Sequence, residues 1–520
     1  MTQLNRAALL TVFLAASQLA SAKNAEVEFR VIDKDTAKAI AVRMHLRNMR
    51  GVTRRARKAP FWHDHFVFYH RVIVSLPAGM YLFAIERGPE YKIVSGTLMV
   101  RGRETDNKTI EMERYVDMKK EGWWSGDLHV ERSPRDMSLL MLAEDLHVAP
   151  VIQWSNLRYR TKRRRVRRKK ISAKLKKEGP LIKVGEDRYF QLQAGKDQSR
   201  GGVLLVYHTN PLLLQATTSE YPGSTSLLTL ANQAAKSIAV AEKPYWLDFP
   251  TWLANGRIDA VCLANDHLLR SNMTNHEAWG MKRSRDRFPA PHGNGRWSQK
   301  IYYRMLECGL QIPPAAGSGS GLAANPVGYN RVYVHCGPKL DYSKWWDGLR
   351  SGRVIVTNGP LLRPLVNGRL PGHVFSAEAG KAVELTPTLK LSLRDPVEYL
   401  EIVKNDEVIK RVRLSDYARR RGMLPPITFK RSGWMLIRAV SSHSKTYRFA
   451  TTGPYYVKIG SRNRVSKSSA QFFANWVKQR MAQLEKSREL RSQTQREEVL
   501  KPHRIALQFW RDLVNQATAP

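Results

Sequence analysis

Apolar residues recur at every second position in short runs near the start of the chain, and turn residues separate these runs. Successive side chains of a strand point to opposite faces of a sheet, so a period of two predicts strands with one buried face. We therefore expect a small antiparallel β-sandwich over residues 23–117. The alternating sets are Val27, Phe29 and Val31; Val42, Met44 and Leu46; Val72, Val74 and Leu76; and Tyr81, Phe83 and Ile85.

The stretch FWHDHF, residues 61–66, interrupts this sandwich and contains an H-x-H pair, His63 and His65. A catalytic zinc site has three protein ligands. No third ligand is evident near the pair in the sequence, so an exposed aromatic loop is the favoured interpretation.

Between residues 122 and 364, apolar runs alternate with segments of helical length such as residues 298–310. Strands that alternate with helices predict a parallel sheet, and the number of units favours a closed or nearly closed α/β barrel. Chemistry in such barrels lies at the carboxyl ends of the strands, where His129, His208, Glu242 and Asn265 fall. The expected strands are DLHV, APVIQW, GVLLVYH, SIAVAE, IDAVCLAN, NRVYVHC and RVIVTNGP.

The alternation of period two returns after Leu365 and predicts a second small β domain over residues 366–460, with Asn405 and Asp406 in a hairpin turn. A helical tail is expected over residues 461–520. Pro502 should break its helix, because proline lacks the N–H that a helix interior needs. The tail carries an apolar stripe that predicts a packing face on the barrel: Phe473, Trp476, Val477, Met481 and Leu484.

The first 22 residues have the features of a signal peptide. Arg6 precedes an apolar run over residues 7–16, and Ala20, Ser21 and Ala22 satisfy the small-x-small rule for cleavage. The alternative is an uncleaved amino-terminal anchor. The run is too short to span a bilayer, which takes about 20 apolar residues, and no later segment qualifies as transmembrane. We expect a secreted or periplasmic protein that is cleaved near Ala22.

The chain of 520 residues carries 86 Lys and Arg against 45 Asp and Glu, a formal net charge of +41. Thirteen basic residues and no acidic one lie between residues 158 and 177, which predicts a solvated insertion over 158–178. This insertion has the charge to dock on anionic polysaccharide, an acidic membrane surface or nucleic acid. Export argues against nucleic acid, and a charged loop with no dedicated partner is the simplest alternative.

Three cysteines, Cys262, Cys308 and Cys336, allow at most one disulfide and lie among apolar neighbours. Buried free thiols are the expected state.

Several motifs in order along the chain resemble the CehA/McbA family of metallohydrolase-like proteins, in the PHP-domain superfamily. The version is similar to secreted planctomycete-type members with an amino-terminal domain like the carboxypeptidase regulatory fold. The resemblance implies a distorted (β/α)7 barrel, flanked here by the two β domains, and active members that use metal ions to hydrolyse phosphate or carbamate esters. The motifs are GWWSGDLHVER, RIDAVCLANDH, KIYYRMLECGLQIPPAAGSGSG, NPVGYNRVYV and WWDGLRSGRVIVTNGPLL.

The chain departs from this family pattern at most metal positions. Active relatives carry H-x-H where this chain has His129 and Glu131, T-D-H-N where it has residues 153–156, and His-Pro where it has Glu242 and two further residues. They carry G-S-D-S-H where this chain has Gly319 and Gly321. Glycine has no side-chain donor, so a cluster of two or three ions is not expected.

Two functional hypotheses follow. In the first, the protein is a metal-dependent hydrolase with one zinc or manganese ion, in which Glu131 or Glu242 acts as general base. The second is a catalytically inactive protein without metal that binds a small molecule, an anionic glycan or another extracellular ligand. The predicted metal ligands are His129, Glu131, Glu242, His208 and His267, and the predicted ligand-binding residues are Trp124, Trp154, Trp246 and Asn265.

Overall fold

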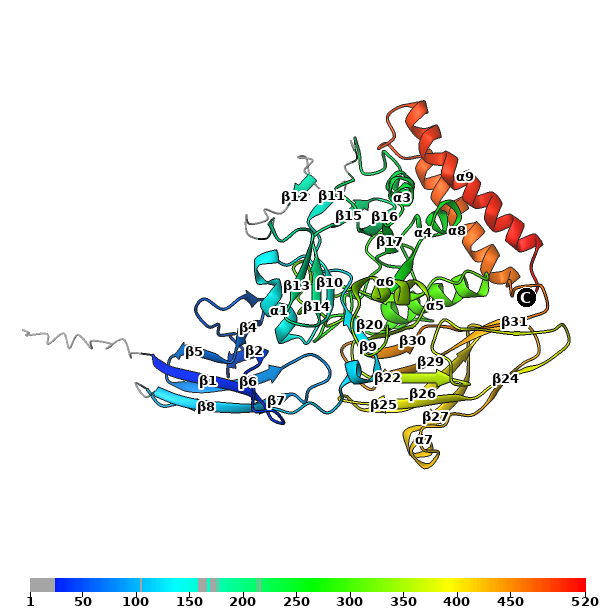
Figure 1. Ribbon diagram of the computed structural model, residues 1–520. Coiled ribbons are helices and arrows are strands. Elements are labelled where there is room, and N and C mark those ends of the chain that lie inside the picture. The colour runs from blue at the N-terminus through cyan, green and yellow to red at the C-terminus, as the bar shows by residue number, and fades with distance from the viewer. Residues whose placement is uncertain are drawn as a thin grey trace, which may run out of the picture.

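The computed structural model describes residues 24–102, 105–157, 166–168, 175, 177–212, 214 and 217–520. The described chain is a mixed α/β protein in which most elements are strands (Figure 1). The predicted signal peptide and most of the basic run lie outside the described residues. No helix in the described ranges is long and apolar enough to cross a membrane.

Residues 25–112 form two sheets that share one apolar core. Strand β1 pairs with β5 in the antiparallel sense and with β8 in the parallel sense, so one pair departs from the predicted antiparallel arrangement. The three-stranded sheet has the order β5 (Arg71–Leu76), β1 (Ala25–Asp33), β8 (Thr105–Met112). The five-stranded sheet has the order β3 (Phe61–Trp62), β4 (His65–Tyr69), β2 (Ala41–Asn48), β6 (Gly79–Glu86), β7 (Val94–Val100).

The FWHDHF segment is a β-hairpin rather than the expected exposed loop. Strands β3 and β4 pair across a turn that contains His63 and Asp64, and His65 faces Trp62. His65 is only 2% exposed because β4 packs beside β2. The expectation of an exposed segment was wrong for His65 and holds for His63.

The predicted alternation of strands and helices is present after residue 122. Strands β17 to β19 are parallel, whereas β15, β16 and β17 pair antiparallel, so the sheet is only partly the parallel one expected. The seven-stranded sheet has the order β12 (Val166–Arg168), β11 (Trp154–Leu157), β15 (Ala194–Ser199), β16 (Gly202–Tyr207), β17 (Ile238–Ala241), β18 (Ala260–Ala264), β19 (Pro314–Ala316). Helices α1 (Met137–Ala143), α3 (Ser224–Gln233), α4 (Phe249–Asn255), α5 (Gly293–Glu307) and α6 (Tyr342–Arg350) lie between strands.

A twelve-stranded sheet runs from this region into the carboxyl-terminal part of the chain. Its main path is β13 (Leu181–Val184), β14 (Arg188–Gln191), β10 (Val148–Pro150), β9 (Trp123–Gly126), β20 (Arg331–His335), β21 (Val354–Thr357), β30 (Phe449–Thr452), β29 (Gly433–Ser441), β26 (Val397–Lys404), β27 (Glu407–Arg413). Strands β23 (Val374–Ala377) and β31 (Tyr455–Ile459) join it off this path, while β22 (Leu361–Val366) pairs with β25 (Pro387–Ser392), and β24 (Val383–Leu385) with β28 (Ile427–Phe429).

Two local predictions in this region, the strand DLHV and the turn at Asn405 and Asp406, have different outcomes. The expected strand DLHV is not a regular strand: β9 ends at Gly126, Leu128 is a bend, and Val130 forms only isolated bridges. The hairpin turn at Asn405 and Asp406 is confirmed between β26 and β27, and both residues have positive φ, as a type I′ hairpin turn requires.

Isolated bridges connect the large sheet to the seven-stranded sheet. Val130 bridges to Val151 on one side and to Ser320 on the other, both in the parallel sense. Among the described residues these are single bridges between open sheets, and no continuous closed barrel is formed.

The tail consists of two packed helices, α8 (Lys467–Glu485) and α9 (Gln493–Asn515), at the edge of the molecule (Figure 1). Phe473, Trp476 and Leu484 are buried, in agreement with the predicted stripe. Pro502 lies inside α9 and does not end it. The helical region is interrupted instead at residues 486–492, and the Ser492 side chain caps the start of α9.

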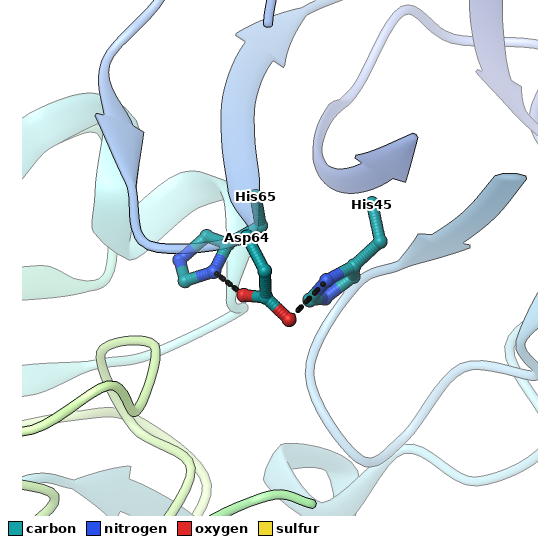
Figure 2. Close-up of side chains that lie close together, drawn as sticks. All are labelled: His45, Asp64 and His65. Carbon is teal, nitrogen blue, oxygen red and sulfur yellow. Dashed lines mark hydrogen bonds and ion pairs between the residues drawn. The ribbon is translucent and has the colours of Figure 1, made fainter. Parts of the chain in front are cut away.

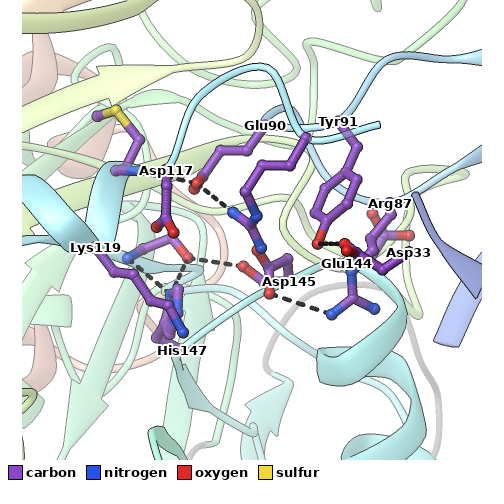
Figure 3. A network of polar contacts seen from close by, with 12 residues as sticks. Asp33, Arg87, Glu90, Tyr91, Asp117, Lys119, Glu144, Asp145 and His147 are labelled. Atoms are coloured by element: carbon purple, nitrogen blue, oxygen red, sulfur yellow. Dashed lines mark hydrogen bonds and ion pairs between the residues drawn. The ribbon is translucent and has the colours of Figure 1, made fainter. Parts of the chain in front are cut away.

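A buried ionic network joins the amino-terminal sheets to the segment after α1 (Figure 3). The Asp145 carboxylate lies 2.5 Å from Arg114, 2.6 Å from Arg188 and 3.5 Å from Arg87. Arg114 also pairs with Glu90 at 2.8 Å. These contacts fix the first two sheets on the part of the chain that carries the strand-end residues.

Candidate functional site

Asp127 organises the segment that presents His129. Its buried carboxylate accepts hydrogen bonds from the backbone N–H groups of His129 at 3.0 Å, Ser318 at 2.9 Å and Gly328 at 2.7 Å. A carboxylate that accepts hydrogen bonds from three backbone donors fixes residues 127–129 against the segments that contain Ser318 and Gly328. The Gly319 N–H donates to the His129 carbonyl oxygen at 2.8 Å, so His129 lies beside the loop that contains Gly319.

His129 lies between two carboxylates in the interior. Its Nε2 atom is 3.0 Å from Glu131 Oε1, and its Nδ1 atom is 3.6 Å from Glu242 Oε1, which is too long for a hydrogen bond. Because opposite edges of the ring face different carboxylates, the three residues are neighbours whose donors do not converge on one point. The metal site predicted at these residues is therefore not formed in this arrangement.

Two buried lysines occupy the space beside these carboxylates. Lys196 Nζ is 2.5 Å from Glu131, and Lys243 Nζ is 2.6 and 2.8 Å from the two oxygens of Glu242. Lys243 Nζ also lies 2.6 Å from Asp266. With His129 protonated, three positive groups balance three carboxylates, and a metal ion would have to displace an ammonium group. We call these six residues the strand-end charge network.

Two of the three glycines of GSGSG, Gly319 and Gly321, have close neighbours that leave no room for a side chain. Gly319 has φ of +64°, and a Cβ there would lie 2.5 Å from Cβ of Asp266. Gly321 has φ of +98°, and a Cβ there would lie 2.5 Å from the Glu131 carbonyl group. Neither position accommodates a larger residue in this backbone. The residues present therefore do not fit the multi-ion centre that the family resemblance implies.

Electrostatics in the network favour the ionised forms. Burial alone lowers the pKa of His129, but the hydrogen bond to Glu131 and the charge of Glu242 outweigh burial and raise this pKa to about 9. Burial raises the pKa of Glu131, yet His129 and Lys196 hold it well below its usual range. Burial likewise opposes ionisation of Asp266, and the adjacent Lys243 lowers the pKa of that carboxyl group.

The shift at His129 gives a pH prediction. A histidine whose pKa rises on folding stabilises the protein fully below its unfolded value of 6.5, and this stabilisation is lost as the pH rises through about 9. We expect the difference in unfolding free energy between the natural chain and His129→Gln to shrink by roughly 3 kcal/mol between pH 6 and pH 10. Urea unfolding at both pH values measures it, and an unchanged difference would contradict the protonated state.

The other predicted metal ligands make different contacts. His208 Nε2 lies 3.1 Å from the Tyr342 hydroxyl group, and the His208 ring packs edge-on against Trp346. His267 Nδ1 lies 2.9 Å from the Tyr245 hydroxyl group. Burial lowers the pKa of His208 to about 4 and that of His267 to about 3, so both rings are neutral. Both histidines have the environment of packed interior residues.

The predicted ligand-binding residues are also interior. Trp124 Nε1 donates to the Gly337 carbonyl oxygen at 2.8 Å, and Trp246 Nε1 donates to Glu242 at 3.0 Å. Trp154 packs directly over Gly195, where any side chain would clash with the indole ring. The Asn265 side chain accepts from the backbone N–H of His267. All four are under 5% exposed and form part of the core or its turns.

A second cluster lies in the amino-terminal sheets (Figure 2). The Asp64 carboxylate is 3.1 Å from His45 Nδ1 and 2.9 Å from His65 Nδ1. Within the described ranges, this is the one group of three His, Cys, Asp or Glu residues whose ligand atoms lie within 4.8 Å of one another, and it could hold a metal ion. His45 could not be predicted as a ligand from the sequence, because only the register of β2 against β4 brings it opposite His65.

An open pocket of about 690 Å³ lies between the helical tail and the strand-end region. Helix α8 contributes Trp476, Gln479 and Gln483, and the facing loops contribute Trp279 and Lys282. The Nε1 atom of Trp476 is buried without a hydrogen-bond acceptor among the described residues. Indole rings with nearby amide and cationic groups can stack on and orient a polar ring.

No protein-family model matches the sequence, and no curated protein matches it significantly. The geometry above therefore carries the functional argument.

Proposed function

We propose that this chain is an exported, catalytically inactive binding protein on a PHP-like barrel of the CehA/McbA type. The lysine–carboxylate pairs of the strand-end charge network carry the proposal. Lys196 and Lys243 supply from within the chain the positive charge that metal ions supply in active enzymes, so the site has no open coordination position at which to activate water.

The proposed barrel is supported by the parallel pairing of its strands. Parallel strands β17, β18 and β19, together with the parallel bridges of Val130, are what a distorted barrel with irregular closure would have. The strand-end charge network lies around those bridges, since Glu131 N–H donates to the Ser320 carbonyl oxygen.

The proposed ligand is an anionic polysaccharide. The net charge of +41 favours long-range attraction of polyanions. The pocket beside α8 provides the partly exposed Trp279 ring, the amide groups of Gln479 and Gln483, and Lys282 for the sugar rings and their acidic groups. Export, proposed from the first 22 residues, would place the protein where such polymers occur.

Binding is tested with a heparin oligosaccharide as the probe, measured by calorimetry on the chain from residue 23 onward. We expect saturable binding that Gln479→Ala weakens about fivefold, the effect of losing one hydrogen bond of about 1 kcal/mol. Gln471→Ala, on an exposed position of the same helix, is the matched control and should leave the affinity unchanged. Absence of binding at physiological salt would contradict the proposed ligand class.

A metal-dependent hydrolase with one zinc or manganese ion is the second candidate. It is favoured by the Nδ1 atom of His129, which is buried without a hydrogen bond among the described residues. In that case Glu131 or Glu242 would act as general base after release from its lysine. Hydrolysis of a phosphoester or carboxylate ester that requires added metal and disappears in His129→Gln would establish this candidate in place of the binding protein.

A further inference from the structure

The cross-strand pair His45 and His65 meets Asp64 in a way that the proposed binding function does not use. The register of β2 against β4 places His45 directly opposite His65, so both side chains project from the same face of the sheet. Their ring centroids are 5.3 Å apart. Asp64 belongs to the hairpin turn, where strand alternation does not apply, and its carboxylate turns toward both rings (Figure 2).

We propose that His45, Asp64 and His65 bind one divalent transition-metal ion through the two Nδ1 atoms and the carboxylate. Two imidazole nitrogens and one carboxylate oxygen are a ligand set that zinc and non-haem iron(II) use in open sites. The ligand atoms already lie within 4.8 Å of one another, so small rotations bring them to a common centre. Three protein ligands leave at least one coordination position for water or an anion.

The surroundings provide room for such an additional ligand. An open cavity of about 580 Å³ is lined by His45 and Asp64, and also by Thr53, Arg47 and Arg270. Hydroxyl and guanidinium groups are donors, so a metal-bound anion would find hydrogen-bond partners in this cavity.

The outer shell of the site contains both a competing and a supporting group. Arg43 Nε donates to His45 Nε2 at 3.2 Å, which places the imidazole proton on Nδ1, facing Asp64. Metal binding moves that proton to Nε2, where the Glu86 carboxylate, now 4.0 Å away, can accept it. A carboxylate behind a ligating histidine is the usual outer-shell partner of a metal.

The positive charge of the nearby arginines does not prevent binding of a cation. Arg43 pairs with Glu86 at 2.7 Å and with Glu144 at 2.5 Å, and Arg270 also pairs with Glu86. Glu86 and Glu144 therefore match the charges of Arg43 and Arg270. Arg394 lies further from Glu86, at 3.8 Å, and the charge of Asp64, which contacts the two imidazoles, is left for the metal.

The test is a titration of the full chain, without affinity histidines, with Co²⁺ followed by visible absorption and with Zn²⁺ as competitor. We expect one equivalent of Co²⁺ in a low-coordinate site. Asp64→Asn should weaken binding by about 100-fold or more, since even outer-shell changes cost 10–100-fold. His65→Gln should do the same.

Two control variants locate the ion. His63→Asn changes the other histidine of the H-x-H pair, which is exposed with φ of +50°, a conformation that asparagine tolerates. His129→Gln changes the strand-end charge network. Both should bind Co²⁺ as the natural chain does. The proposal would be overturned if no saturable Co²⁺ binding were found, or if Asp64→Asn left the binding unchanged. Because Asp64 is half-exposed, Asp64→Asn should fold and can decide the question even if His65→Gln does not fold.

Discussion

Replacing Lys243 by methionine is expected to lower the free energy of unfolding by about 3–5 kcal/mol, the usual cost of removing one partner from a buried ion pair. The Lys243 ammonium group lies within 2.8 Å of both Glu242 oxygens and 2.6 Å from Asp266, and its side chain is 3% exposed. Methionine keeps the length of the side chain but leaves two buried carboxylates without their cation. The measurement is urea unfolding at pH 7 followed by tryptophan fluorescence.

Lys344→Met is the matched control for this substitution. Lys344 is exposed at the start of α6, and only its backbone N–H takes part in the cap with Asp341. Its replacement should change stability by less than about 0.5 kcal/mol. If Lys243→Met had the same free energy of unfolding as this control, the two carboxylates would not depend on the lysine. The proposal that lysines take the place of metal ions would then be wrong.

Asp145→Asn is expected to cost a similar amount, about 3–5 kcal/mol, because it removes the buried carboxylate that three arginines share. Asparagine has the same shape and tolerates the positive φ of 49° at this position, so the effect comes from charge and not from backbone strain. Urea unfolding at neutral pH measures the loss.

The Asp145 prediction also has a direction with pH. Burial opposes ionisation, but Arg114, Arg87 and Arg188 hold the pKa of Asp145 well below its ordinary value. The carboxylate therefore contributes its full stabilisation above the unfolded pKa of about 4 and loses it only as the pH falls further. The variant should approach the natural chain in stability only in acid. Asp416→Asn, at an exposed ion pair with Arg419, is the control and should cost less than about 1 kcal/mol.

Local pattern was a good guide to the elements that depend on near neighbours in sequence. Alternation predicted β1, β2, β5 and β6, and the Asn405–Asp406 turn predicted the hairpin between β26 and β27. The prediction that Pro502 would break its helix was wrong. A proline removes one backbone hydrogen bond, but a packed helix such as α9 retains the others. DLHV did not form the regular strand expected, and Asp127 there accepts hydrogen bonds from the backbone of residues 318 and 328, which lie far along the chain and which a local pattern does not reveal.

The residues of the candidate sites also divide into those that the sequence identified and those whose positions depend on strand pairing. The sequence predicted that His129, Glu131 and Glu242 lie at one end of the expected barrel, and in the structure they are neighbours. It did not identify Lys196, whose position depends on the pairing of β11 with β15, or His45, whose position depends on the register of β2 with β4. Lys243 was visible beside Glu242, and a lysine next to a glutamate at the end of an apolar strand was the available signal of an internal ion pair.

An anomalous difference map from crystals of the full chain soaked in Zn²⁺, recorded at the zinc edge, distinguishes the lysine–carboxylate pairs from a metal site directly. We expect no peak between His129, Glu131 and Glu242, with the ammonium groups of Lys196 and Lys243 in contact with the carboxylates. A zinc peak within coordination distance of His129 and either carboxylate would show that the ion displaces a lysine. That result would rule out the inactive binding protein and favour the hydrolase candidate.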